Sequence, residues 1–149
     1  MKIILIIFIS IIIAGLFYFF YLGYQSQTGS ANGIVNLKLT PCSKKPNCVC
    51  TEFPNDKLHF VKPITVRPIN IKNMMNAIEL TGGIIINSTD NYIAATYTSR
   101  IFRYVDDFEV RIDYENNLIH IRSASRVGHS DMGANLKRIE KFKRVLKNI

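Results

Sequence analysis

The stretch that decides the fold is Phe108-Glu-Val-Arg-Ile-Asp-Tyr-Glu-Asn-Asn-Leu-Ile-His-Ile-Arg122. Apolar and polar residues alternate along it, which is the period of a strand with one buried face. In its middle, Asn116-Asn117 supplies a two-residue turn, because asparagine tolerates a positive φ. The stretch therefore predicts an antiparallel hairpin with one apolar face and one charged face.

The pairing across this hairpin follows from the length of the turn. A two-residue turn predicts the facing pairs Ile112–Ile121, Asp113–His120, Arg111–Arg122, Glu109–Ala124 and Asp107–Arg126. The charged members of these pairs all lie on one face, whereas Asp106 points to the other. We therefore expect a ladder of charges along one sheet face that ends beside Gly128.

The flanking segments predict the rest of the domain. Two strand-like runs, Ile84–Ser88 and Tyr92–Thr98, are joined by Thr89-Asp-Asn91 and predict a second hairpin. Asn70 is expected to cap a helix, and Ser130 or Asp131 to cap a last one. The last helix is expected to bury Met132, Leu136, Ile139, Phe142 and Leu146. The predicted fold class is α+β: an antiparallel β-sheet packed by two helices, preceded by one N-terminal transmembrane helix.

The N-terminal run from Ile3 to Leu22 carries no charge and is long enough to cross a bilayer, which takes about 20 apolar residues. Lys2 and the amino terminus are the nearby positive groups, so a single-pass membrane protein is expected, with its N-terminus cytoplasmic and its domain on the periplasmic or extracytoplasmic side. A cleaved signal peptide is the alternative, although Gly23-Tyr-Gln-Ser-Gln is a poor cleavage site. The chain thus divides into a transmembrane signal-anchor helix (1–24), a flexible linker (25–36) and a single α+β domain (37–149).

The net charge of +8 raises the question of an anionic partner. A basic domain outside the cytoplasm meets anionic lipid headgroups or envelope polymers, and an exported location argues against nucleic acid. The alternative is a solvated basic surface without a partner.

Three cysteines lie in Pro41-Cys-Ser-Lys-Lys-Pro-Asn-Cys-Val-Cys50. In an oxidising compartment, Cys42 and Cys48 are the candidate disulfide, because the residues between them can form a turn. Zinc binding and unpaired thiols are the alternatives, although the spacing matches no common zinc pattern. Cys50 would remain an odd thiol in the disulfide interpretation.

A candidate site lies where Arg122-Ser-Ala-Ser-Arg-Val-Gly128 leaves the sheet and a basic helix begins. Guanidinium groups and the free N–H groups of a helix start both favour an anion. The candidate ligand-binding residues are Arg122, Arg126, Asp107, Glu109, Ser130 and Asp131. The alternatives are a solvated row of salt bridges, or a hydrolase-type pocket in which His129 joins Asp107, Glu109 and Arg126. No catalytic residue, metal site or cofactor is predicted.

The same residues resemble a known family, the uncharacterised domain of unknown function 1499. The resemblance rests on Pro46-Asn-Cys-Val49, Asp106-Asp-Phe-Glu109, and Arg122-Ser-Ala-Ser-Arg-Val-Gly128 followed by Ser130-Asp-Met-Gly133, Asn135, Arg138 and Glu140. It implies a compact α+β domain that is often sent to the envelope, without an established activity. Where family members commonly have serine after Cys-Val, this chain has Cys50.

The expected function is non-catalytic binding or assembly at the cell envelope, with an anionic ligand or an envelope protein as partner. A hydrolase-type enzyme that uses an Asp/Glu/Arg pocket is the alternative. A purely structural partner of a membrane complex would instead show an exposed apolar patch beside the anchor.

Overall fold

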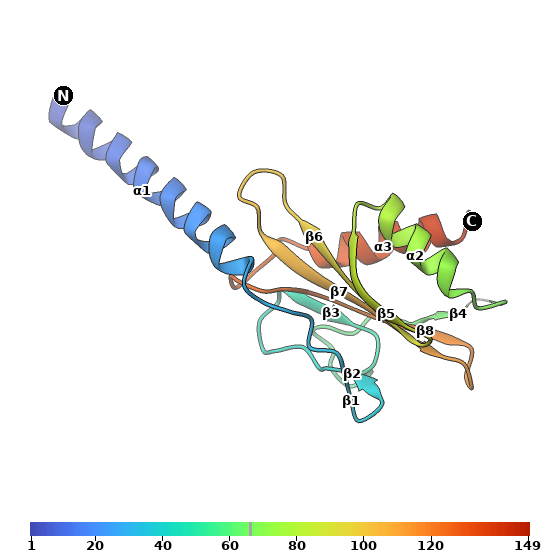
Figure 1. Cartoon of the computed structure of the whole chain (residues 1–149). Coiled ribbons are helices and arrows are strands. Elements are labelled where there is room, and N and C mark those ends of the chain that lie inside the picture. Colours follow the sequence, from blue (N-terminus) through green and yellow to red (C-terminus); the bar gives the residue numbers. More distant parts are fainter. Residues whose placement is uncertain (66) are drawn as a thin grey trace.

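The computed structural model describes residues 1–65 and 67–149. A long N-terminal helix projects from a sheet that has two helices on one face and a loop-rich segment on the other (Figure 1). The helices are α1 (Lys2–Ser26), α2 (Ile71–Leu80) and α3 (Ala134–Leu146). The strands are β1 (Ile34–Val35), β2 (Lys38–Leu39), β3 (Cys48–Cys50), β4 (Ile64–Thr65), β5 (Ile84–Thr89), β6 (Tyr92–Thr98), β7 (Val105–Asp113) and β8 (Leu118–Ser125).

The main sheet is antiparallel throughout, in the order β3-β8-β7-β6-β5, and β4 pairs with β8 as well. This arrangement confirms the predicted α+β class. The predicted β5–β6 hairpin is confirmed, but it closes at the pair Thr89–Tyr92, so its turn is one residue shorter than predicted. Strand β3 and the small β1–β2 hairpin were not predicted, because two or three residues are too few to display a period.

The predicted pairing of β7 with β8 is wrong by two residues. Glu109 faces Arg122, and Asp107 faces Ala124. The turn has four residues, 114–117, because the Asp113 carboxylate accepts hydrogen bonds from the N–H and the side-chain amide of Asn116, and Asn117 takes a φ of 54°. A shift of two leaves every side chain on its predicted face.

Helices α2 and α3 cover the apolar face of the sheet. Met74 and Ile78 of α2 and Ile139 and Phe142 of α3 pack with the inward side chains of β6, β7 and β8, among them Phe108. The predicted cap of α2 is confirmed, since the Asn70 side chain accepts a hydrogen bond from the N–H of Lys72.

The predicted start of α3 is wrong by several residues. The helix begins at Ala134, and its N-cap is Gly133 with a φ of 77°. Asp131 still acts on the helix start, because its carboxylate accepts hydrogen bonds from the N–H groups of Gly133 and Asn135. Met132 and Leu136, predicted to be buried, are 91% and 43% exposed, because Met132 precedes the helix and Leu136 lies on its outer side.

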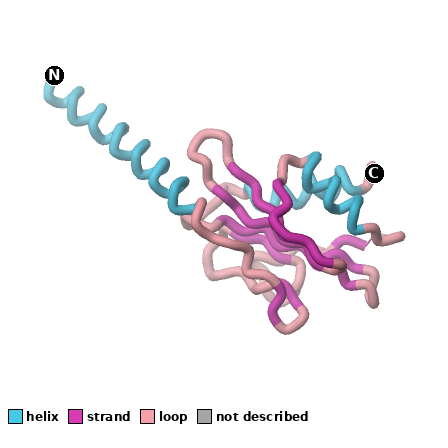
Figure 2. The backbone as a smooth tube through the Cα atoms, viewed as in Figure 1, coloured by secondary structure: helices cyan, strands magenta, loops and turns pink. Residues whose placement is uncertain are grey.

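The charged face of the sheet is covered by the chain between α1 and residue 53. Its loops run along the face opposite α2 and α3 (Figure 2). Leu39 and Cys50 form a second small core there with Tyr92 and Ala94 of β6. The composition of residues 25–36 predicts a flexible tether, but in the structure β1 pairs with β2, and the Gly33 N–H donates a hydrogen bond to Glu109 of the main sheet. The division at residues 24 and 36 stays a prediction.

Helix α1 is long and apolar enough to span a membrane, at about 37 Å for its 25 residues. Its end is packed on the domain: Gly23 lies so close to the backbone of Phe102 that a Cβ atom would be 1.8 Å from the carbonyl oxygen. The Ser26 hydroxyl accepts a hydrogen bond from the N–H of Val105, and the Gln27 side chain donates one to the carbonyl of Arg103. The junction between helix and domain is therefore a set of specific contacts.

Candidate functional site

The charged ladder is a buried network. Glu109 is fully buried, and one of its oxygens accepts a hydrogen bond of 2.8 Å from Arg122. The other oxygen accepts hydrogen bonds from the Tyr92 hydroxyl and the Gly33 N–H, both also at 2.8 Å. Burial and the adjacent carboxylate hold the pKa of Tyr92 well above its usual range, so the hydroxyl remains a donor. The row of salt bridges expected on this face is therefore present, but it is buried rather than solvated.

Arg126 forms the second ion pair of this face. Its guanidinium meets Asp107 with two nitrogens, Nη2 at 2.7 Å and Nε at 3.0 Å. Its Nη1 donates a hydrogen bond of 3.1 Å to the carbonyl of Ser26, at the end of α1. Such a two-nitrogen contact fixes the plane of the guanidinium, so Arg126 connects the sheet to the N-terminal helix with a defined geometry.

A polar cavity of about 330 Å³ lies between the end of this ladder and the covering segment. Its lining includes Arg122, Arg126, Asp107 and, from the covering segment, Lys45. The Asp107 charge is paired with Arg126, whereas the carboxylate of Glu109 is not part of the lining. Since Arg122 is itself paired with Glu109, the charge in this lining that has no ion-pair partner among the described residues is that of Lys45.

Arg122 has an unused donor in this region. Within residues 1–65 and 67–149, its Nε is the one buried side-chain polar atom that has no hydrogen-bond partner. A buried unpaired donor is costly, because it has lost its hydration without gaining a protein acceptor. An acceptor atom delivered by a ligand would relieve that cost.

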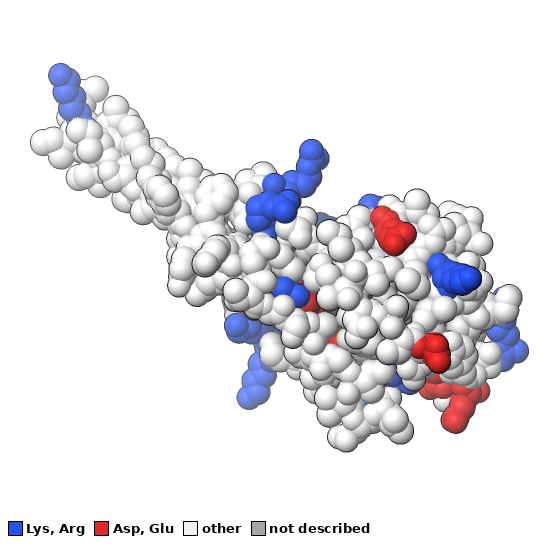
Figure 3. Space-filling model, viewed as in Figure 1, with Lys and Arg blue, Asp and Glu red and all other residues white. Residues whose placement is uncertain are grey.

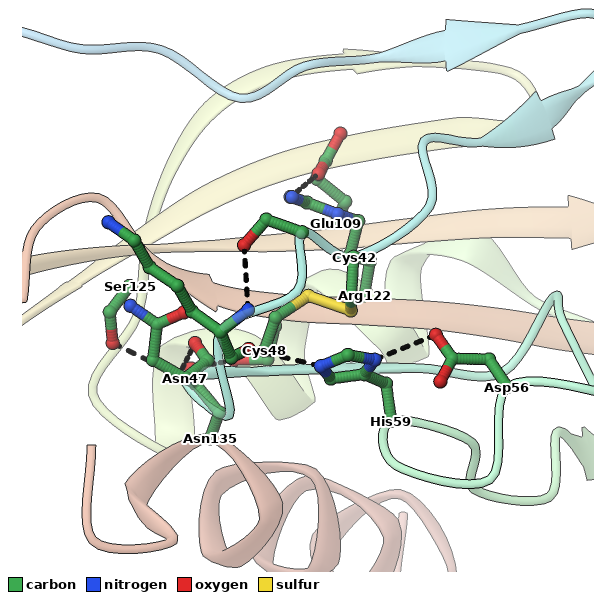
Figure 4. Close-up of a disulfide and its surroundings, with 12 residues drawn as sticks. Cys42, Asn47, Cys48, Asp56, His59, Glu109, Arg122, Ser125 and Asn135 are labelled. Carbon is green, nitrogen blue, oxygen red and sulfur yellow. Dashed lines mark hydrogen bonds and ion pairs between the residues drawn. A yellow bond between two sulfur atoms is a disulfide. The ribbon is translucent and has the colours of Figure 1, made fainter. Parts of the chain in front are cut away.

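The loop that carries Lys45 is closed by a disulfide between Cys42 and Cys48 (Figure 4). The carbonyl of Lys45 lies 3.0 Å from Nε2 of His59, whose Nδ1 lies 2.7 Å from the Asp56 carboxylate. The lysine backbone is therefore held in place while its side chain is exposed. Burial raises the pKa of the remaining thiol, Cys50, to about 11, so this cysteine stays protonated at neutral pH.

Asn135 connects α3 to two residues that line this cavity, Asn47 and Ser125. Its side-chain amide donates hydrogen bonds to the carbonyl of Asn47 at 2.9 Å and to the Ser125 hydroxyl at 3.1 Å. Its oxygen accepts hydrogen bonds from Ser123 and Arg138. Sequence reasoning gave this residue no role, although an asparagine on the apolar stripe of a helix signals a buried polar contact.

Arg138 reaches the opposite face of the sheet from Arg126. It lies 2.7 Å from Asp106, which points to the helix side as the strand alternation predicted. Its guanidinium also lies over the ring of Tyr97, at 4.7 Å from the centroid. The neighbouring carboxylates Asp106 and Asp107 are thus paired with different arginines on different faces.

The structure separates the predicted helix-start residues from the arginines. Ser130 accepts a hydrogen bond from the N–H of Met132, and Asp131 is engaged with the first turn of α3. Neither residue lines the cavity. The N–H groups proposed for an anion at this helix start are therefore occupied by Asp131.

The hydrolase-type constellation is not assembled. Asp107 is engaged by Arg126 and Glu109 by Arg122, so neither carboxylate is free to move a proton. His129 lies on an exposed turn outside the cavity lining, and it makes no side-chain hydrogen bond within the described part of the chain. His129 is therefore not among the residues that line the cavity with Asp107 and Arg126.

Comparison with known proteins gives one relationship. A family model described as protein of unknown function (DUF1499) matches residues 38–146, which include the disulfide loop, the paired carboxylates and the arginine corner. No curated protein matches the chain. Since the match covers well over half of the chain, this protein belongs to the DUF1499 family.

Proposed function

We propose that this chain is a membrane-anchored binding protein of the cell envelope, whose cavity beside Arg122 and Arg126 takes a small anionic ligand. In this proposal α1 crosses the membrane with Lys2 on the cytoplasmic side, and the domain lies on the periplasmic or extracytoplasmic side. The apolar length of α1 and the polar lining of the cavity support it.

The observation that carries the ligand proposal is the unpaired Nε of Arg122, beside a cavity whose rim carries the charge of Lys45. A carboxylate or phosphate oxygen is the acceptor that best satisfies a buried guanidinium N–H. The cavity volume of about 330 Å³ is at the lower end of the range for small-molecule sites. Lys45, on its disulfide-closed loop, supplies a second cationic contact from the rim.

The test uses the full chain in detergent micelles and measures its melting temperature with inorganic phosphate, small carboxylates and sugar phosphates. Lys45→Gln removes the rim charge, and Lys44→Gln is the matched control, because that adjacent exposed lysine does not line the cavity. We expect at least one probe to raise the melting temperature, with a Kd weakened roughly fivefold by Lys45→Gln and unchanged by Lys44→Gln. The proposal fails if no probe stabilises the protein, or if both variants respond alike.

A further inference from the structure

We infer that the loop between β6 and β7, residues 99–104, is a second membrane contact of this protein and binds anionic phospholipid headgroups at the surface that α1 crosses. This inference rests on the membrane-spanning role proposed for α1. It assigns the loop a ligand of its own, distinct from the ligand of the cavity.

The contacts of the loop with α1 determine how deep the loop lies in the membrane. The ring of Phe102 lies 5.2 Å from the ring of Phe19 and 5.2 Å from that of Phe20. Both partners belong to the apolar run Ile3 to Leu22, so Phe102 shares the level of its last turns. A helix that spans the membrane with this run places the loop at the boundary between hydrocarbon and headgroups.

The loop is held in that position by its backbone. The N–H of Ser99 donates a hydrogen bond to the carbonyl of Tyr104, and the N–H of Tyr104 donates one to the Ser99 hydroxyl, which together close the base of the loop. The Gln27 side chain and the close approach of Gly23 fix the other side. Figure 1 shows the loop rising beside the domain end of α1.

The side chains of the loop match the two chemistries of a membrane surface. Ile101 is 72% exposed at its tip. Arg100 and Arg103 flank the apolar pair, are exposed, and form no salt bridge in the part of the chain that the structure describes. Lys and Arg side chains gather over this loop beside the end of the helix (Figure 3). An apolar side chain flanked by exposed arginines is typical of segments that bind to the headgroup layer of an anionic bilayer.

The chain contains no tryptophan, so single tryptophans can report the depth of each site. The full chain is reconstituted in lipid nanodiscs with phosphatidylglycerol, and quenching by brominated lipids is compared with quenching by aqueous acrylamide. Ile101→Trp reports the loop and Phe17→Trp the membrane helix. Tyr114→Trp, an exposed position at the opposite end of β7, is the matched control.

We expect the tryptophan at position 101 to lose fluorescence to brominated lipid, as position 17 does, while position 114 responds to acrylamide alone. The loop inference is overturned if position 17 is quenched by lipid but position 101 behaves like position 114. If position 17 also responds only to acrylamide, the membrane-spanning proposal for α1 fails and the loop inference fails with it.

The headgroup preference is tested by charge removal. Arg100→Gln with Arg103→Gln should abolish any gain in lipid quenching at position 101 when phosphatidylglycerol replaces phosphatidylcholine. Arg144→Gln with Lys147→Gln removes the same charge from the outer side of α3 and should leave the gain intact. An equal response of the two double variants, or a gain that inorganic phosphate competes away, overturns the assignment to lipid headgroups.

Discussion

Glu109 and Arg122 face each other directly across β7 and β8, and their side chains form an ion pair of 2.8 Å that the solvent hardly reaches. A buried pair of this kind gains little over an apolar pair, but it is costly to break, because the remaining charge has no partner. The Tyr92 hydroxyl and the Gly33 N–H complete the coordination of the carboxylate. Through the Gly33 N–H, the buried pair therefore attaches the covering segment to the sheet.

Removing the carboxylate charge should be strongly destabilising. Glu109→Gln leaves the Arg122 guanidinium buried without a counter-charge, and we expect the free energy of unfolding to fall by about 3–5 kcal/mol. Denaturant unfolding of the full chain in detergent measures it. The double variant Glu109→Gln with Arg122→Met should recover part of the loss, and a double variant as unstable as the sum of the single changes would contradict this account.

The junction between α1 and the domain should not tolerate a methyl group at position 23. A Cβ atom there meets the Phe102 carbonyl, so Gly23→Ala has to displace the β6–β7 loop. We expect hydrogen exchange at the Val105 N–H, which bonds to Ser26, to accelerate about tenfold. Gly15→Ala is the control on the same helix, because its Cβ meets no atom within 4 Å. Equal exchange in the two variants would refute the close contact.

Reduction should weaken the domain through the Cys42–Cys48 disulfide. The loop is short, so a loss of about 2 kcal/mol is expected from the entropy of the unfolded chain. Thiol counting on the unfolded protein should find one reactive cysteine before reduction and three after it. Cys50→Ala should keep its sensitivity to reductant, whereas Cys42→Ser with Cys48→Ser should show none. Three reactive thiols in the unreduced protein would exclude the bridge.

Stability should fall between neutral and mildly acidic pH because of His120. Burial lowers the pKa of its imidazole, against the opposing effect of Glu52 and with the help of Arg111. The unfolded chain then binds the proton more tightly, so stability is full above the unfolded pKa of about 6.5 and is lost as the pH falls through the lower folded value. Melting temperatures from pH 8 to pH 5 should decline less steeply in His120→Gln. An unchanged slope in this variant would assign the decline to other groups.

The sequence predicted those parts of the fold in which apolar and polar residues follow a regular period. The alternation from Phe108 to Arg122 placed the strand side chains on their correct faces, and this assignment holds even though the pairing was wrong by two residues. The turn length was missed because Asn116-Asn117 has the composition of a two-residue turn. Only the hydrogen bonds from Asn116 to Asp113 extend it to four residues.

The covering segment could not be predicted in the same way. Glu52 lies 2.6 Å from Arg111, although 59 residues separate them in the sequence. A hydrophobic period describes local structure and cannot predict such a long-range contact. For the same reason the charged face was open to three interpretations from its sequence alone. Lys45 was missed as a candidate site residue, because its neighbourhood depends on how the disulfide loop folds back over the sheet.

The absence of a side chain at Gly23 also limits how far the domain can move relative to α1. In the membrane-spanning proposal for α1, the contacts of the helix end with Phe102 and Arg126 hold the domain in a fixed position at the bilayer surface. Under that proposal, a ligand or protein partner would reach the domain at the membrane surface. The search for partners should therefore begin among molecules that are themselves confined to that layer.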